Sequence, residues 1–188
     1  MARSPIPLDA RPAVRMALAV ERWGDVEFVD RCVRLLQTMS WGDEPELLSY
    51  LGGNHGARFV ERGLGREGYW LRVWPLRAML YAWMPEAEPA VVTALADEHW
   101  RVREMSCKVL VRRELGTGVD GAHALLADPV PRVRVAAARA VAEVGEVEQA
   151  ARLRTLLTDE SSQVAAQAER ALRRLAERTD RDPQQLGN

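Results

Sequence analysis

Lysine, isoleucine and cysteine are nearly absent from this chain of 188 residues. Lys108 is the one lysine, Ile6 the one isoleucine, and Cys32 and Cys107 are the two cysteines. Two cysteines without C-x-x-C spacing exclude a disulfide scaffold and indicate reduced, buried thiols in a cytoplasmic protein. No run of about 18 apolar residues is present, so we expect neither a membrane span nor a signal-peptide core.

An excess of charge of one sign is also missing. The 26 lysine and arginine residues are offset by 27 aspartate and glutamate residues, which gives a formal net charge of −1. This balance argues against a strongly basic nucleic-acid-binding chain. With 47% hydrophobic and 28% charged residues, the composition is that of a globular protein, and the length suits one domain.

An internal repeat with a period of 31 residues is the strongest pattern in the sequence. Asp97, Asp128 and Asp159 follow one another at this spacing. Three apolar columns keep the same period over the same three copies. These columns are Leu95, Leu126 and Leu157, then Val102, Val133 and Val164, then Leu110, Val141 and Leu172.

Each copy has the pattern of a short helix, a turn and a longer helix. The short apolar helix ends near the aspartate, which is placed to cap the free N–H groups of the next helix. In the second copy the longer helix has apolar residues at i, i+3, i+4, i+7 and i+8, which form one stripe. The stripe consists of Val133, Ala136, Ala137, Ala140 and Val141. The sequence therefore predicts an all-α protein of stacked helix pairs.

This pattern resembles the HEAT repeat, in particular the short HEAT-like repeats of the phycobilisome-lyase type. The resemblance rests on the leucine pair, the aspartate and the Val-Arg or Val-Ala that opens the longer helix, and it covers residues 88–178. It implies a right-handed α-solenoid in which the arginine reaches the aspartate of a neighbouring repeat. Ala165 breaks this pattern in the third copy, as a terminal repeat often does. The implied ladder consists of Asp97, Arg103, Asp128, Arg134 and Asp159.

The domain organisation expected from these patterns is a single domain. Residues 1–53 form an irregular helical cap with helices at 10–21, 25–39 and 43–52. The repeats follow at 54–84 (degenerate), 88–114, 119–144 and 146–178, and 179–188 form a polar tail. In the degenerate repeat a helix from Tyr69 to Met84 is predicted to kink at Pro75, or else to begin there.

All six tryptophans precede residue 101, and two of them share a helix face. Trp70 and Trp74 are four residues apart, with Tyr69, Tyr81 and Trp83 nearby. The group fits an aromatic pocket for a base, a peptide or a small ligand. It also fits the core between large, poorly repeating helices, which is the favoured interpretation, although the sequence leaves both open.

The candidate partner-binding residues lie on the longer helices, which in HEAT proteins line the concave face. Eight cations and six anions fall between residues 97 and 141, a mixture that favours a salt-bridged helix surface over a basic groove. Arg103 and Arg134 are assigned to the ladder. The remaining candidates are Trp100, Arg101, Lys108, Arg112, Arg132 and Arg139.

Signatures of catalysis and of cofactor binding are lacking. His55, His99 and His123 are far apart and lack metal-ligand spacing, so we expect no metal site and no cofactor. Some HEAT-like proteins are DNA glycosylases that excise alkylated bases. That resemblance would make Glu104 the acidic residue and Trp100 and Trp74 the aromatic wall.

The function expected from the sequence is a cytoplasmic, non-catalytic scaffold that binds a protein or peptide on its concave helix surface. Nucleic-acid binding, with base excision as its enzymatic form, is the alternative. A lyase-like adaptor for a chromophore ranks third, because only the repeat subtype suggests it. The patterns do not specify the partner or the oligomeric state.

Overall fold

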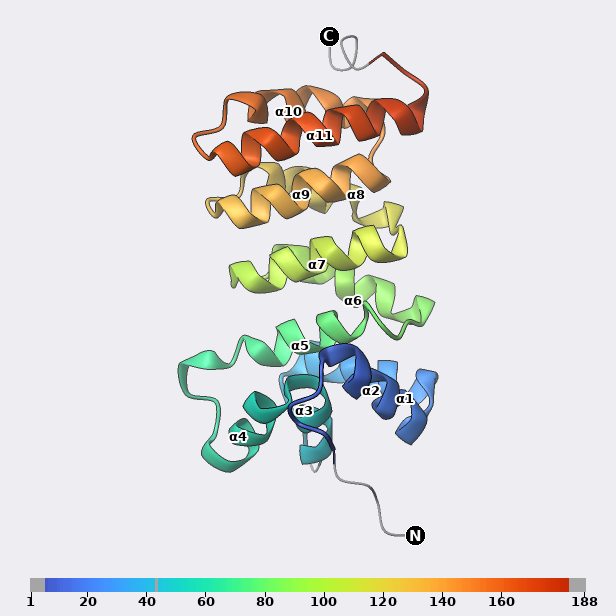
Figure 1. The fold of residues 1–188 in the computed structure, drawn as a ribbon, viewed down its shortest axis with the longest axis vertical. Coiled ribbons are helices and arrows are strands. Elements are labelled where there is room, and N and C mark those ends of the chain that lie inside the picture. Colours follow the sequence, from blue (N-terminus) through green and yellow to red (C-terminus); the bar gives the residue numbers. More distant parts are fainter. Residues whose placement is uncertain (1–5, 43, 183–188) are drawn as a thin grey trace. The chain divides into compact units, whose positions relative to one another are not determined.

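The computed structural model of the chain describes residues 6–42 and 44–182. All regular structure in these residues is helical, with α-helices joined by short 3-10 turns (Figure 1). Contacts divide the chain into two compact units, residues 1–90 and 91–188. Residues 54–84 thus belong to the first unit, whereas the sequence pattern places them with the repeats. Most of the predicted polar tail, 183–188, lies outside the described residues.

In its described residues, 6–42 and 44–90, the first unit has five α-helices before α6, and they follow no regular repeat. The helices expected at 10–21, 25–39 and 43–52 match α1 to α3 within two residues. α5 packs mainly against α2, and α4 packs mainly against α3. This pairing differs from the degenerate helix pair expected over 54–84. The helices are α1 (Pro12–Trp23), α2 (Asp25–Thr38), α3 (Pro45–Gly52), α4 (Asn54–Arg62) and α5 (Trp70–Ala78).

The helix α5 continues through Pro75 and ends at Ala78. It is shorter than the helix expected up to Met84, and the alternative start at Pro75 is wrong. The chain leaves the helix through tight turns, in which the N–H groups of Leu80 and Tyr81 donate to carbonyl oxygens three residues earlier. Pro75 has no N–H to donate, so α5 lacks one intrahelical hydrogen bond there, and the helix nevertheless continues for three more residues.

Two arginines of the first unit, the buried Arg15 and the half-buried Arg77, bind the C-terminal carbonyl groups of α3. The Nε of Arg15 donates to the carbonyl oxygen of Tyr50 at 2.9 Å. A terminal nitrogen of Arg77 donates to that of Leu51 at 2.6 Å. The last carbonyl groups of a helix have no intrahelical partner, so these contacts satisfy them. Burial lowers the pKa of both arginines, and the aperiodic sequence does not predict this arrangement.

The second unit is a solenoid of helix pairs. Each short helix runs through a 3-10 turn to one of the three aspartates and is followed by a long helix. The long helices α7, α9 and α11 lie side by side, with the short ones behind them (Figure 1). This arrangement confirms the predicted all-α fold. The helices are α6 (Glu88–Thr93), α7 (Trp100–Arg113), α8 (Val119–Ala124), α9 (Pro131–Val144), α10 (Ala150–Thr155) and α11 (Ser162–Thr179).

The core of the second unit is built from the periodic apolar columns, except at Leu157, which is 40% exposed in the third copy. Val102, Val133 and Val164 are each 0% exposed. Ala137 and Ala140 are also fully buried, and their small side chains allow α9 to pack closely between α7 and α11. Each repeat buries its apolar stripe against its neighbours, so stability comes from stacking.

Candidate functional site

The three periodic aspartates close the turns between short and long helices. The Oδ1 atom of Asp97 accepts a hydrogen bond from the backbone N–H of His99 at 2.8 Å. Asp128 and Asp159 accept in the same way, at 2.8 and 2.9 Å, from the residues two positions later. We expected these side chains to cap N–H groups inside the helix. They instead bind the N–H of the residue at the helix boundary, because a short aspartate side chain reaches the backbone two positions on.

Two arginines connect these turns between successive repeats. The Nε of Arg103 donates to Oδ2 of Asp128 at 2.7 Å, and its Nη1 donates to the carbonyl oxygen of Asp97 at 2.8 Å. One repeat later, Arg134 donates to the Asp159 carboxylate at 2.7 Å and to the carbonyl oxygen of Asp128 at 2.9 Å. Each arginine thus ties the turn of its own repeat to the aspartate of the next.

These arginine–aspartate pairs are largely shielded from water. The side chains of Arg103 and Asp128 are 13% and 3% exposed. The hydrogen bond from Arg134 is the main reason why the pKa of Asp159 is lowered and that of Arg134 is raised. Because these pairs connect successive repeats and are shielded from water, the residues hold the solenoid together and offer little to a partner.

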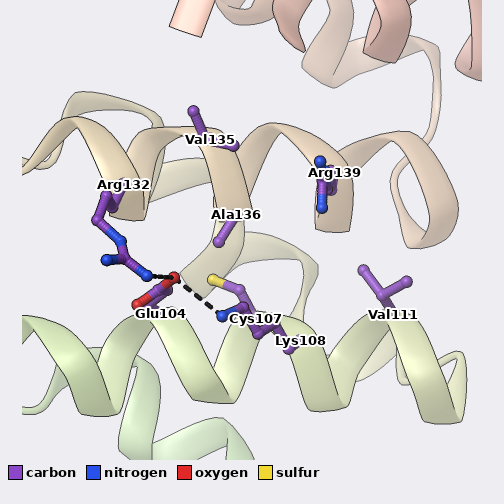
Figure 2. Close-up of a pocket in the computed structure, with 8 residues that line it drawn as sticks. All are labelled: Glu104, Cys107, Lys108, Val111, Arg132, Val135, Ala136 and Arg139. Carbon is purple, nitrogen blue, oxygen red and sulfur yellow. Dashed lines mark hydrogen bonds and ion pairs between the residues drawn. The ribbon is translucent and has the colours of Figure 1, made fainter. Parts of the chain in front are cut away.

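A groove lies between α7 and α9, on the side of the long helices. Its volume is about 240 Å³. Both helices line it with residues at i, i+3, i+4 and i+7, so each presents one face to the groove. The lining residues, drawn in Figure 2, are Glu104, Cys107, Lys108 and Val111 of α7 and Arg132, Val135, Ala136 and Arg139 of α9.

Glu104 is held at one end of the groove by two cations. Its Oε1 accepts hydrogen bonds from Nζ of Lys108 at 2.9 Å and from Nη2 of Arg132 at 3.1 Å (Figure 2). The side chain of Glu104 is 11% exposed, whereas those of Lys108 and Arg132 are 42% and 60% exposed. The carboxylate is therefore neutralised by its neighbours, while the cations keep contact with solvent.

Trp100 stands beside this charged end, at the first residue of α7. The guanidinium carbons of Arg101 and Arg132 lie 4.4 and 5.3 Å from the centre of its ring. Guanidinium groups over an indole ring are attracted by the negative potential of its face. Arg132 is thereby held between the ring of Trp100 and the carboxylate of Glu104.

Arg139 occupies the other end of the groove. Its Nε donates to Oε1 of Gln167 on α11 at 3.2 Å. Gln167 is neutral, and within the described part of the chain Arg139 forms no ion pair. The groove therefore contains three cations and one carboxylate.

The comparison with protein families agrees with the repeat architecture. The family model for HEAT repeats matches residues 88–173. Residues 88–173 are HEAT repeats. A comparison with curated proteins found no match. The narrower resemblance to the phycobilisome-lyase type stays a prediction.

The HEAT repeats bring together most of the predicted partner-binding residues. Lys108, Arg132 and Arg139 line the groove, and Trp100 and Arg101 flank its charged end. Arg112 is exposed on α7 and does not line the groove. The apolar floor was not predicted from the sequence, although the shared i, i+3, i+4 and i+7 spacing on the two helices was a signal for it. The floor consists of Cys107, Val111, Val135 and Ala136.

Trp74 lies in the first unit and is 2% exposed. Its ring packs 5.2 Å from that of Phe59 and 5.7 Å from that of Trp70, centre to centre. A Cβ atom on Gly52 would come within 2.8 Å of the indole, so a glycine is needed there. A ring packed on this many sides offers no open face on which a base could stack.

Cys107 borders the groove but is chemically inert. Burial raises the pKa of its thiol to about 12, so the thiol stays protonated at neutral pH. Cys32 is also buried with a raised pKa, and both thiols are free. In the described residues, three or more histidine, cysteine or acidic side chains never gather closely enough to hold a metal ion. Across those residues no helix has the length and apolarity needed to cross a bilayer.

Proposed function

We propose that the HEAT repeats form a non-catalytic protein-interaction module, and that α7 and α9 bind a segment of a partner protein in the cytoplasm. HEAT repeats are commonly protein-interaction scaffolds. The observation that supports the proposal most is the groove itself, with an apolar floor between charged ends. An apolar centre inside a polar rim is the usual anatomy of a protein interface.

The size of the groove favours a side chain of a partner over a small molecule. Small-molecule sites typically enclose about 300–1,000 Å³. The groove has about 240 Å³, which suits one or two inserted side chains. The exposed cations around it then contact the polar rim of the partner.

Nucleic-acid binding is the second candidate, favoured by the guanidinium of Arg132 on the ring of Trp100. A surface of this kind attracts phosphates and also stacks on bases. Base excision has less support, because Glu104 is already bound by Lys108 and Arg132 and Trp74 is buried. The same experiment separates the two candidates.

The test is site-specific photo-crosslinking in cell extract. A benzophenone amino acid replaces Lys108 at the groove or, as a matched control, Arg152, which is exposed on α10. We expect the groove position to crosslink one protein that the control position does not reach. That protein, identified and purified, should bind the unmodified chain in calorimetry and lose at least about tenfold in affinity for Val135→Arg.

Two results would contradict the proposed function. In the first, both positions crosslink the same proteins, or none. In the second, the products from the groove position disappear after nuclease treatment, which would identify the partner as nucleic acid. Val135 is a half-buried residue of the groove floor, so its replacement should leave the thermal unfolding temperature unchanged.

A further inference from the structure

The charges of the groove are unbalanced toward the positive. Lys108 and Arg132 share a single oxygen of Glu104, and Arg139 donates to the neutral amide of Gln167. Three cations and one carboxylate therefore line the groove. A partner with carboxylates placed opposite the two arginines would complement this field and would be steered toward it.

The arginines keep hydrogen-bond donors available for such carboxylates. A guanidinium has five N–H donors in a planar fork. Arg132 uses one amino group for Glu104, and its guanidinium carbon lies 5.3 Å from the centre of the Trp100 ring. Arg139 uses its Nε for Gln167. Both side chains are thus held in position before a partner binds, which reduces the entropy that binding has to remove.

The spacing of the two arginines selects the conformation of the partner. Arg132 and Arg139 are seven residues apart on α9, which is about 10 Å along a helix axis. Figure 2 shows them at opposite ends of the groove, with Ala136 between them. Side chains on one face of an extended strand repeat every two residues, at about 6.6 or 13 Å, and do not match this distance.

The spacing of side chains on one face of a helix matches the distance of about 10 Å between the two arginines. Carboxylates at positions i and i+7 lie about 10 Å apart on one face, with positions i+3 and i+4 between them. An aliphatic side chain at one of these positions would point into the floor formed by Cys107, Val111, Val135 and Ala136. Laying an amphipathic helix against a groove is an established mode of recognition.

We propose that the partner segment is an acidic amphipathic helix of the pattern Glu-x-x-Leu-x-x-x-Glu. One glutamate binds Arg132 beside Trp100, the other binds Arg139, and the leucine fills the floor of the groove between them. This inference rests on the proposed function, which requires only that a protein segment binds there.

The probe is a fluorescein-labelled, end-capped peptide of about 18 residues with this pattern in an alanine-rich host, long enough to be helical in isolation. Fluorescence anisotropy with the full chain should show saturable binding that weakens as salt rises. A second probe with glutamine in place of both glutamates should bind at least about tenfold more weakly. The variants Arg132→Gln and Arg139→Gln should each weaken binding of the acidic probe several-fold, whereas Arg152→Gln on α10 should leave it unchanged.

Three results would overturn the inference. In the first, the glutamine probe binds as tightly as the acidic probe. In the second, a probe with its two glutamates on opposite helix faces binds as tightly as the acidic probe. In the third, labelled single-stranded DNA binds more tightly than the peptide probes. If the groove crosslinks a protein but the acidic probe fails to bind, the proposed function stands and this inference falls. If the groove crosslinks no protein, the proposed function itself fails.

Discussion

Asp128 illustrates how single residues hold the repeats together. Its Oδ1 atom closes the turn before α9, and its Oδ2 atom pairs with Arg103 of the preceding repeat. The side chain is only 3% exposed. Removing one partner of a buried ion pair leaves the other charge without compensation, which costs far more than an exposed pair contributes.

Replacing Asp128 by alanine should therefore destabilise the chain by about 3 kcal/mol. The loss leaves the Arg103 guanidinium without its carboxylate and the Val130 N–H without its acceptor. Urea denaturation followed by circular dichroism measures it. Arg173→Ala is the control, because the Arg173–Glu169 pair is exposed and its loss should cost less than about 0.5 kcal/mol. Equal effects of the two variants would contradict a structural role for the ladder.

Asp159 should make stability depend on pH. Arg134 lowers its pKa in the folded state, so the pair contributes fully above the unfolded pKa of about 3.9. This contribution is lost as the pH falls through the lowered folded pKa. Asp159→Asn keeps an oxygen for the Ser161 N–H but removes the charge. The stability difference between wild type and this variant, from urea melts, should be constant near neutral pH and shrink below about pH 4. A difference that persists unchanged to pH 3 would contradict this assignment.

Within each long helix of the repeats, the periodic apolar residues pack against the neighbouring helices. Val133 is 0% exposed in α9, between α7 and α11. The substitution Val133→Asp buries a charge without a partner and should cost at least about 3 kcal/mol. Leu157→Asp is the control, since Leu157 is 40% exposed. If Val133→Asp keeps the thermal stability of the wild type, the register assigned to the repeats is wrong.

The contact between α3 and α4 depends on a glycine. A Cβ atom on Gly56 would lie 1.8 Å from the carbonyl oxygen of Leu48, a clash with backbone that side-chain motion does not relieve. Although alanine favours helices over glycine, Gly56→Ala should therefore destabilise the first unit by about 2 kcal/mol. Gly68→Ala has open space around its Cβ and should be neutral or slightly stabilising. Differential scanning calorimetry of both variants gives the comparison, and a stabilising Gly56→Ala would refute the close approach.

The helices also show where sequence reasoning succeeds. The apolar stripe of Val133 and its neighbours repeats every 31 residues, so the stacked helix pairs and their register follow from the pattern alone. The end of α5 does not follow from the sequence pattern, because the helix ends in turns after Ala78 and not at Pro75. The partners of α4 and α5 were missed too, since large side chains such as Trp74 set them and no periodicity records such contacts.

The whole molecule combines a unit without a sequence repeat and a unit built from periodic repeats. In the HEAT repeats, periodicity places Lys108, Arg132 and Arg139 on neighbouring helices, so most of the candidate surface is predictable. The contact of Glu104 with Arg132 is not, because it depends on the meeting of α7 and α9 in space. In the aperiodic unit no pattern predicts that Arg15 and Arg77 bind carbonyl groups at the end of α3.

A charge swap at one end of the groove is the sharpest test of whether the groove binds an acidic helix. The variant Arg139→Glu is combined with the acidic probe and with a probe in which the second glutamate is lysine, and anisotropy gives the four affinities. We expect the variant to bind the acidic probe at least about tenfold more weakly than wild type does, and the lysine probe to recover most of that loss. If the lysine probe gains nothing on the variant, or if the acidic probe binds both proteins equally, the groove does not recognise an acidic helix.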